Sequence, residues 1–344
     1  MKLSVLDQSP ALTGRSESES IRESLSLARH AEDLGYHRFW VSEHHNIPAI
    51  VGSAPEVLMA AIAATTQRIR IGSAGVMLPH YSALKVAEQF RTLEALAPGR
   101  IDLGLGRAPG GDMRTAQALN PNAQSAADDF PQQVFDLQAW SQAGEDASHR
   151  GIHAHPHGPF APEMWILGSS DYGAQLAAHF GLPYAFAYFF TDGQGAEQAV
   201  ALYRRLYKPS ERHPKPEPTL CVWAFAADTA AEAHHHALSR DRWRVDRQRG
   251  VFGALQSPEA VAATGFSAAD QPTLDAMHQR ALVGSAAQVG AQLRALASEF
   301  DLSELVVNTW SHDPAARRHS YALLAQEFGL QHSLDSQAQA PQSA

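Results

Sequence analysis

The chain has 344 residues, of which 44% are hydrophobic, so it is long enough for one large α/β domain or two ordinary ones. Its net charge of −9 and its lack of long Lys/Arg runs argue against a nucleic-acid or membrane partner. The single cysteine, Cys221, excludes an internal disulfide, and because we predict no signal peptide or membrane-spanning run, we expect a cytoplasmic protein.

Short apolar runs alternate with longer helical patterns along the chain. Eight strands are predicted, over residues 2–7, 38–42, 68–78, 100–106, 164–168, 183–187, 219–227 and 304–308. Helices are predicted over residues 16–35, 54–66, 82–97, 171–180, 193–207, 285–299 and 314–328. This alternation predicts an α/β fold, a closed (β/α)8 TIM barrel forming a single domain over residues 1–330. A doubly wound open sheet is the competing fold, but it would not need so many strands.

Two long stretches interrupt the repeating unit, and they are predicted insertions after strands four and seven. The first covers residues 107–129 and the second covers residues 228–283. Long insertions in a barrel are usually lids or binding loops. The second stretch mixes charge clusters with Ala and Gly and has few apolar residues, so we expect it to be a mobile lid. Residues 331–344 are polar and are predicted to be a disordered tail.

A Glu and two adjacent His residues follow the second predicted strand in "WVSEHHN". Glu43, His44 and His45 could form a metal site, an acid/base pair or a hydrogen-bonded corner. The active sites of barrels lie at the carboxyl ends of the strands, so these side chains lie on the expected rim. Residues 72–75 and Arg107 follow other strands and are expected on the same rim.

Two features of the rim could bind a phosphate. Arg107 lies in the glycine-rich "GLGRAPGG", where backbone amides and a guanidinium can approach an anion. Ser169, Ser170 and Gly173 lie at the start of a predicted helix, whose amino end favours a phosphate. Each feature alone has an ordinary explanation, a surface arginine or simple helix capping. Facing each other across a barrel mouth, they would form a phosphate clamp.

Histidine-rich segments raise the alternative of a metal centre. His153, His155 and His157 alternate in "GIHAHPHG", and three more histidines run together at 234–236. Metallohydrolase barrels draw ligands from several strand ends, whereas these histidines lie in insertions and before proline-rich turns. We therefore predict no metal site, and a metal-dependent hydrolase is the less favoured class.

Three segments together resemble the bacterial luciferase-like flavin-dependent monooxygenases. They are "WVSEHHN", "IGSAGVMLPHYSALKVAEQFRTLEALAPGRIDLGLGRAPGGD" and "WILGSSDYGAQLAAHFGLPYAFA". The resemblance is closest to the single-chain luciferase-like oxidoreductases and covers the chain from residue 3 to about residue 329. It implies a barrel that binds FMN in the reduced form, supplied by a separate NAD(P)H:flavin reductase. It also implies that O2 is used to oxygenate a small apolar organic substrate such as an aldehyde.

The resemblance implies roles for individual residues as well. His44 is the expected catalytic imidazole beside the flavin, while Glu43 and His45 are expected to orient the loop. The bond between Ala74 and Gly75 is the expected non-proline cis peptide under the flavin ring. The expected phosphate contacts come from Arg107, Ser169, Ser170, Tyr172 and Gly173.

The sequence departs from the light-emitting luciferases at one position. Their α subunits carry a reactive Cys just before the phosphate-binding Arg, where this chain has Gly106, so we do not predict useful light emission. The resemblance further implies a homodimer packed through helices beside the early strands, and the apolar helix predicted at 54–66 fits that role. The same family includes oxidoreductases that use the deazaflavin F420 and a flavin-binding protein without turnover, which are the alternative functions.

Overall fold

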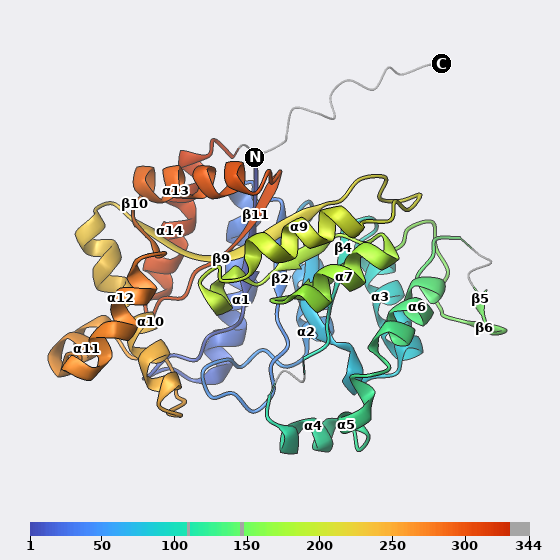
Figure 1. Ribbon diagram of the computed structural model, residues 1–344, viewed down its shortest axis with the longest axis horizontal. Coiled ribbons are helices and arrows are strands. Elements are labelled where there is room, and N and C mark those ends of the chain that lie inside the picture. The colour runs from blue at the N-terminus through green and yellow to red at the C-terminus, as the bar shows by residue number, and fades with distance from the viewer. Residues whose placement is uncertain (109–110, 145–147, 331–344) are drawn as a thin grey trace.

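Eight parallel strands close into a barrel in the computed structural model, which describes residues 1–108, 111–144 and 148–330 (Figure 1). The barrel strands are β1 (Lys2–Asp7), β2 (Arg38–Val41), β3 (Arg70–Met77), β4 (Ile101–Gly106), β7 (Glu163–Gly168), β8 (Tyr184–Phe186), β9 (Pro218–Ala227) and β11 (Glu304–Asn308). They pair in that order, and β11 pairs with β1 to close the ring. The predicted (β/α)8 barrel is confirmed. The predicted tail at 331–344 lies outside the described residues.

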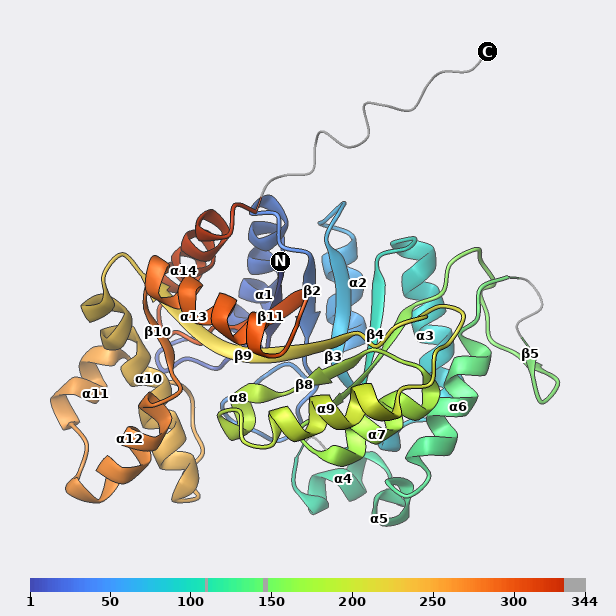
Figure 2. The same ribbon diagram turned by 45° about the horizontal axis from the view of Figure 1, so that its top comes forward.

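Helices surround the barrel and fill the connections between its strands (Figure 2). Those that alternate with the barrel strands are α1 (Glu17–Asp33), α2 (Pro55–Ala63), α3 (Ala83–Leu96), α6 (Phe130–Trp140), α7 (Asp171–Phe180), α9 (Ala196–Leu206), α13 (Ala286–Glu299) and α14 (Pro314–Glu327). The additional helices are η1 (Leu78–His80), α4 (Met113–Leu119), α5 (Ala123–Ala126), α8 (Tyr188–Thr191), α10 (Ala230–Gln248), α11 (Pro258–Thr264), η2 (Ala268–Asp270) and α12 (Gln271–His278). In the described part of the chain, none of these helices has the length and apolar character needed to cross a bilayer.

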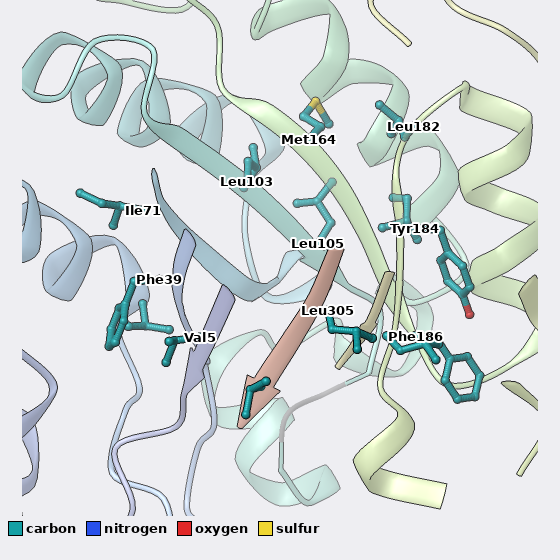
Figure 3. Packing of buried hydrophobic residues seen from close by; sticks show 14 of the residues in the cluster. Val5, Phe39, Ile71, Leu103, Leu105, Met164, Leu182, Tyr184, Phe186 and Leu305 are labelled. Atoms are coloured by element: carbon teal, nitrogen blue, oxygen red, sulfur yellow. The ribbon is translucent and has the colours of Figure 1, made fainter. Parts of the chain in front are cut away.

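The core follows from the alternation of side chains along each strand. On β1, Leu3 and Val5 point outward and pack in the large cluster between barrel and helices, whose strand residues appear in Figure 3. Leu6 belongs instead to a smaller cluster inside the barrel, together with Trp40 and Trp165. Both faces of the strands are therefore buried, which explains why the strands appear in the sequence as nearly continuous apolar runs.

Three short strands were not predicted. β10 (Leu282–Ser285) pairs with the second half of β9, outside the closed ring. Its four residues merge into a helix start, because Ser285 is the N-cap of α13 and forms a capping box with Gln288. β5 (Ser148–His149) and β6 (Ile152–His153) form an antiparallel hairpin. The segment around His153, interpreted from the sequence as lying outside any strand, therefore contains a short one.

The segment 228–283 is better anchored than its sequence suggested. α10 packs against β9 and β10, and its Ala233 and Ala237 join a buried cluster with Phe225 and Leu255. The expectation that this segment has few apolar anchors was wrong, because small alanine side chains let the helix approach the strands closely. Its position was predicted correctly, since α10 follows β9 directly.

Five charged side chains cross-link the amino ends of the strands. Arg38 donates from Nη1 to Asp102 Oδ2 at 2.9 Å and from Nε to Glu304 Oε1 at 3.0 Å. Arg70 adds a 2.5 Å contact to Asp102 and a 3.2 Å contact to Glu163. Burial alone would raise the pKa of Asp102, but the two arginines lower it, so the carboxylate stays charged. This charge cluster connects β2, β3, β4, β7 and β11 at the end of the barrel opposite the candidate site.

Candidate active site

A cavity of about 780 Å³ opens at the carboxyl end of the strands. Its size is typical of sites for organic ligands and cofactors. The lining mixes side chains from the loops after β1, β2 and β4 with side chains from α8, β9, β11 and α10. The loop residues include His44, Asn46, Ile47, Ala108 and Asp112. The rim predicted from the sequence is therefore where the cavity lies.

Glu43 is a structural anchor beneath this rim. Its side chain is completely buried and accepts three hydrogen bonds. The donors are the Met77 backbone N–H at 2.9 Å, the Tyr81 hydroxyl at 2.7 Å and the His45 imidazole at 2.7 Å. These bonds fix the loop after β2 to the end of β3. Among the three interpretations of the "EHH" run, the hydrogen-bonded corner describes Glu43 and His45.

His44 faces the other way and lines the cavity. Its backbone N–H donates to Gly52 O at 2.9 Å, and its Nδ1 lies 3.1 Å from Ser42 Oγ. Burial is the main cause that lowers the pKa of His44 from 6.5 to about 4; the Glu43 carboxylate opposes it, and His45 and Arg247 add to it. The imidazole is therefore neutral at physiological pH, so it can accept a proton or share a hydrogen bond without carrying a charge.

The strand beside this corner has an irregular backbone. The peptide bond between Ala74 and Gly75 is cis, as the resemblance implied, and the register between β3 and β4 shifts between Ser73 and Val76. A Cβ added to Gly75 would lie 2.5 Å from Leu167 Cδ1 and 2.7 Å from the Gly104 carbonyl oxygen. Position 75 therefore has no room for a side chain in this conformation.

Arg107 and the start of α7 lie together on the rim. The Arg107 guanidinium carbon is 4.1 Å from the centre of the Tyr172 ring, although the two residues follow different strands. Ser169 and Ser170 are exposed, and the Ser170 side chain makes no capping hydrogen bond to α7. Gly173 is buried, and a Cβ built on it would lie 3.3 Å from the Tyr184 ring. The missing side chain therefore allows α7 to start close to β8. This arrangement leaves a guanidinium and the amino end of a helix available to an anion.

The structure does not join all predicted residues in one continuous surface. His44 lines the cavity, whereas Ala74, Gly75 and the Arg107–Tyr172 pair lie outside its lining. Ala108, next to Arg107, does line it, so the phosphate-binding candidates border the cavity. The metal alternative gains no support, because no group of three or more potential ligands is found in the described ranges. His153, His155 and His157 do pack together, with ring centres 4.6–6.4 Å apart.

One wall of the cavity was missed from the sequence. It comes from α10 and β9 and consists of Trp223, Arg240, Trp243, Arg244 and Arg247. The spacing 240, 244 and 247 places three arginines on one helical face, a signal that is present in the sequence. That signal was interpreted only as a charged lid, because the sequence does not show which face of α10 points at the barrel.

The chain matches the family model described as luciferase-like monooxygenase over residues 1–301. A luciferase-like monooxygenase of Escherichia coli K12 is 42% identical over 321 residues, which cover 93% of this chain and 95% of that protein. An N-acetyl-S-alkylcysteine monooxygenase of Bacillus subtilis is 35% identical over 331 residues, covering 94% of this chain and 97% of that protein.

Solved structures show the same fold. A crystal structure of apo-MsnO8 is similar with a TM-score of 0.89 and 38% identity, over 96% of this chain and 99% of that one. More distant structures share the fold alone. One is the oxygenating constituent of 3,6-diketocamphane monooxygenase of Pseudomonas putida in complex with FMN, with a TM-score of 0.67, 19% identity, and coverage of 95% of this chain and 97% of that one. Another is an F420-dependent secondary alcohol dehydrogenase, with a TM-score of 0.63, 13% identity, and coverage of 95% and 98%.

Proposed function

The chain belongs to the luciferase-like monooxygenase family, and from that premise we propose that it is an FMN-dependent monooxygenase acting with reduced flavin and O2. The observation that carries the proposal is the cavity lined by the neutral His44 and bordered by the Arg107–Tyr172 pair. The proposed substrate is a small organic molecule with a largely apolar body, and aldehydes are the first class to screen.

The residues of the rim fit a flavin mononucleotide. Arg107 and the amino end of α7 would hold the terminal phosphate, with Ser169 and Ser170 as hydroxyl donors. The irregular backbone at Ala74 and Gly75 would lie against the ring system. When bound, the reduced flavin supplies the electrons that activate O2.

This chain's own groups would position the reactants and exclude water. His44, neutral and backed by the Ser42 hydroxyl, would hold or accept a proton at its free ring nitrogen beside the reacting atoms. Glu43 would act only through position, since its oxygens are already occupied by Met77, Tyr81 and His45. The segment 228–283 would cover the cavity during the reaction and limit the entry of water.

FMN is the proposed cofactor rather than F420 because Arg107 and the amino end of α7 form a compact anion site, apart from the arginines of α10. A single guanidinium beside one helix start suits a terminal monophosphate. F420 in the same fold, or flavin binding without turnover, are the alternatives that an activity assay separates. The reduced FMN would come from a separate NAD(P)H:flavin reductase.

We also propose that the protein acts as a homodimer in the cytoplasm. α2 buries Met59 and Ile62 against the barrel, yet leaves Val57 65% exposed on its outer face. An apolar side chain on the outer face of such a helix suits a contact between two copies.

The proposal is tested by a product screen with reduced FMN, O2 and a panel of aldehydes and other small organic molecules, read by mass spectrometry. We expect a product that carries one oxygen atom from 18O2. His44→Ala should retain FMN binding while the product formed per reduced flavin falls by about 10²–10⁴-fold. His179→Ala is the matched control, because His179 is exposed at the far end of α7.

Three results would contradict the proposal. An unchanged product yield in His44→Ala would remove His44 from the reaction. Turnover with F420 but not with FMN would replace the cofactor. Tight FMN binding with no product from any compound of the panel would favour the flavin-binding protein without turnover.

A further inference from the structure

The α10 wall of the cavity carries more positive charge than the cavity's acids can balance. Arg240, Arg244 and Arg247 all contribute to the lining. Among the described residues that form this lining, Asp112 is the only acidic one. Asp112 already accepts hydrogen bonds from the Thr115 backbone and from Asn46, so it is committed to the start of α4. The wall therefore presents an excess of cations to whatever occupies the cavity.

The carboxylate of Asp192, which lies behind the wall, is the ionic partner of two of the three arginines. Arg244 binds Asp192 through both guanidinium nitrogens, at 2.5 and 2.6 Å. Arg240 lies 3.8 Å from the same Asp192 and, among the described residues, makes no hydrogen bond. Its guanidinium instead stacks on the Trp223 ring at 4.0 Å. Arg247 lies 5.5 Å from the Trp243 ring and forms no ion pair within the described ranges.

Arg240 is the most deeply buried of the three, and its only ionic partner among the described residues, Asp192, is bound more closely by Arg244. The Arg240 side chain is only 9% exposed, so its charge is held away from bulk water. Burial and the neighbouring Arg244 together lower the pKa of Arg240 to about 9, against the opposite effect of Asp192 and Asp241. A buried guanidinium with no acceptor is unfavourable, and an anion that reaches it forms a charge-assisted hydrogen bond.

Other polar groups of this wall are also donors. The indole N–H groups of Trp223 and Trp243 in the wall, and of Trp310 packed against Trp243, are buried and have no acceptor in the described part of the chain. One unpaired acceptor, Asn308 Oδ1, also lines the cavity, at the end of β11 and away from α10 in the chain. Donors therefore gather at α10 and its neighbours.

The largest apolar part of the lining lies on other elements. Carbon-rich side chains come from the loops after β2 and α10 and from α8, namely Ile47, Pro48, Ile50, Phe189, Phe190 and Phe252. An occupant that matches both parts has an apolar body and one anionic end. The flavin phosphate does not need this wall, because Arg107 and α7 offer it a separate place. Figures 1 and 2 both show α7 and α10 well apart.

We propose that the substrate carries a carboxylate, which binds to Arg240 and Arg247 of α10, while its apolar body lies against the aromatic side of the cavity. That the bound acid is a substrate rests on the proposed function. The anion-binding site itself rests only on the contacts of the α10 wall. It narrows the substrate class from small apolar molecules to amphipathic acids.

The test compares two ligands of equal shape on the FMN-loaded protein, octanoate and its neutral analogue octanamide, by titration calorimetry. We expect octanoate to bind at least about tenfold more tightly than octanamide. Arg247→Met and Arg240→Met should each abolish most of that preference. Arg249→Met is the matched control, because Arg249 ends the same helix but pairs with Asp270 outside the cavity, and it should keep the preference.

A second pair of titrations separates the substrate from the cofactor as the source of the anion. FMN and riboflavin are titrated into the Arg247→Met protein. If the ratio of FMN affinity to riboflavin affinity is the same in the variant and in the native protein, the arginines belong to a substrate site. A selective loss of FMN binding in the variant would assign the arginines to the flavin phosphate and overturn the inference. Equal binding of octanoate and octanamide to the native protein would also overturn it.

Failure of the proposed function would look different. An octanoate preference that needs Arg247, in a protein that forms no oxygenated product, would leave the anion site in place and remove the monooxygenase. Oxygenation of neutral substrates only, with no preference for octanoate, would keep the monooxygenase and remove the anion site. Because Arg247 is exposed, its replacement tests the inference even if Arg240→Met does not fold.

Discussion

His44 should make the folded protein less stable in mild acid, and the size of the effect follows from its surroundings. The imidazole has a pKa of about 4 in the folded chain, compared with 6.5 when it is free. Because the folded pKa is the lower one, the unfolded chain takes up the proton first as the pH falls. The stability contribution is therefore complete above about pH 6.5 and is lost progressively as the pH falls toward 4.

The two pKa values correspond to about 3 kcal/mol over the full range. Between pH 7 and pH 5, the linkage relation gives a loss of about 2 kcal/mol in the free energy of unfolding from this one residue. Other groups contribute too, including His37, whose pKa burial lowers to about 3. A variant that lacks only the His44 imidazole isolates its share.

Urea unfolding of the flavin-free protein measures this difference. The native protein and His44→Gln are each unfolded at pH 7 and at pH 5, and the change in the free energy of unfolding is compared. We expect the native protein to lose about 2 kcal/mol more than the variant. Equal losses would show that His44 is not held neutral by burial, and would refute the view that it acts as an uncharged imidazole in the cavity.

Three further predictions concern the anion site, the buried corner and the outer face of α2. Arg107→Ala should weaken FMN binding at least about tenfold and leave riboflavin binding nearly unchanged, as fluorescence titration would show; equal losses would exclude a phosphate contact. Glu43→Ala should lower the free energy of unfolding by about 3–5 kcal/mol, because it leaves the Met77 and Tyr81 donors without an acceptor. Tyr81→Phe should lower it by only about 1 kcal/mol. Similar losses for the two variants in urea unfolding would contradict the role of Glu43 as the acceptor shared by these donors. Val57→Glu should convert a dimer to a monomer in light scattering, and a native monomer at micromolar concentration would contradict the homodimer.

The barrel could be predicted because each of its units is local. Apolar runs such as 101–106 and capping signals such as Ser16 with Glu19 mark the beginnings and ends of elements without reference to the rest of the chain. β10 escaped prediction for the opposite reason. Its strand character comes from pairing with β9, a contact made some 60 residues away along the chain.

The residues of the candidate site also differ in how far their positions could be predicted from local sequence. Glu43, His44 and His45 could be placed on the rim because they directly follow a strand. The arginines of α10 could not be assigned, since their role depends on which helical face meets the barrel and on a partner, Asp192, that follows α8. Long-range pairing of this kind leaves no periodic signal in the sequence.

The charge cluster at the amino ends of the strands has a consequence for engineering. Arg38, Arg70 and Asp102 tie neighbouring strands together through contacts that involve none of the loops at the cavity end. Removal of any one of them would leave buried charges without partners, at a cost of about 3–5 kcal/mol. Exchange of the cavity loops with those of a relative touches none of these contacts. Chimeras that keep this charge cluster and take whole βα loops from a relative should therefore have a melting temperature near that of the parent. Their substrate specificity should follow the imported loops, so the barrel can serve as a scaffold for different cavities.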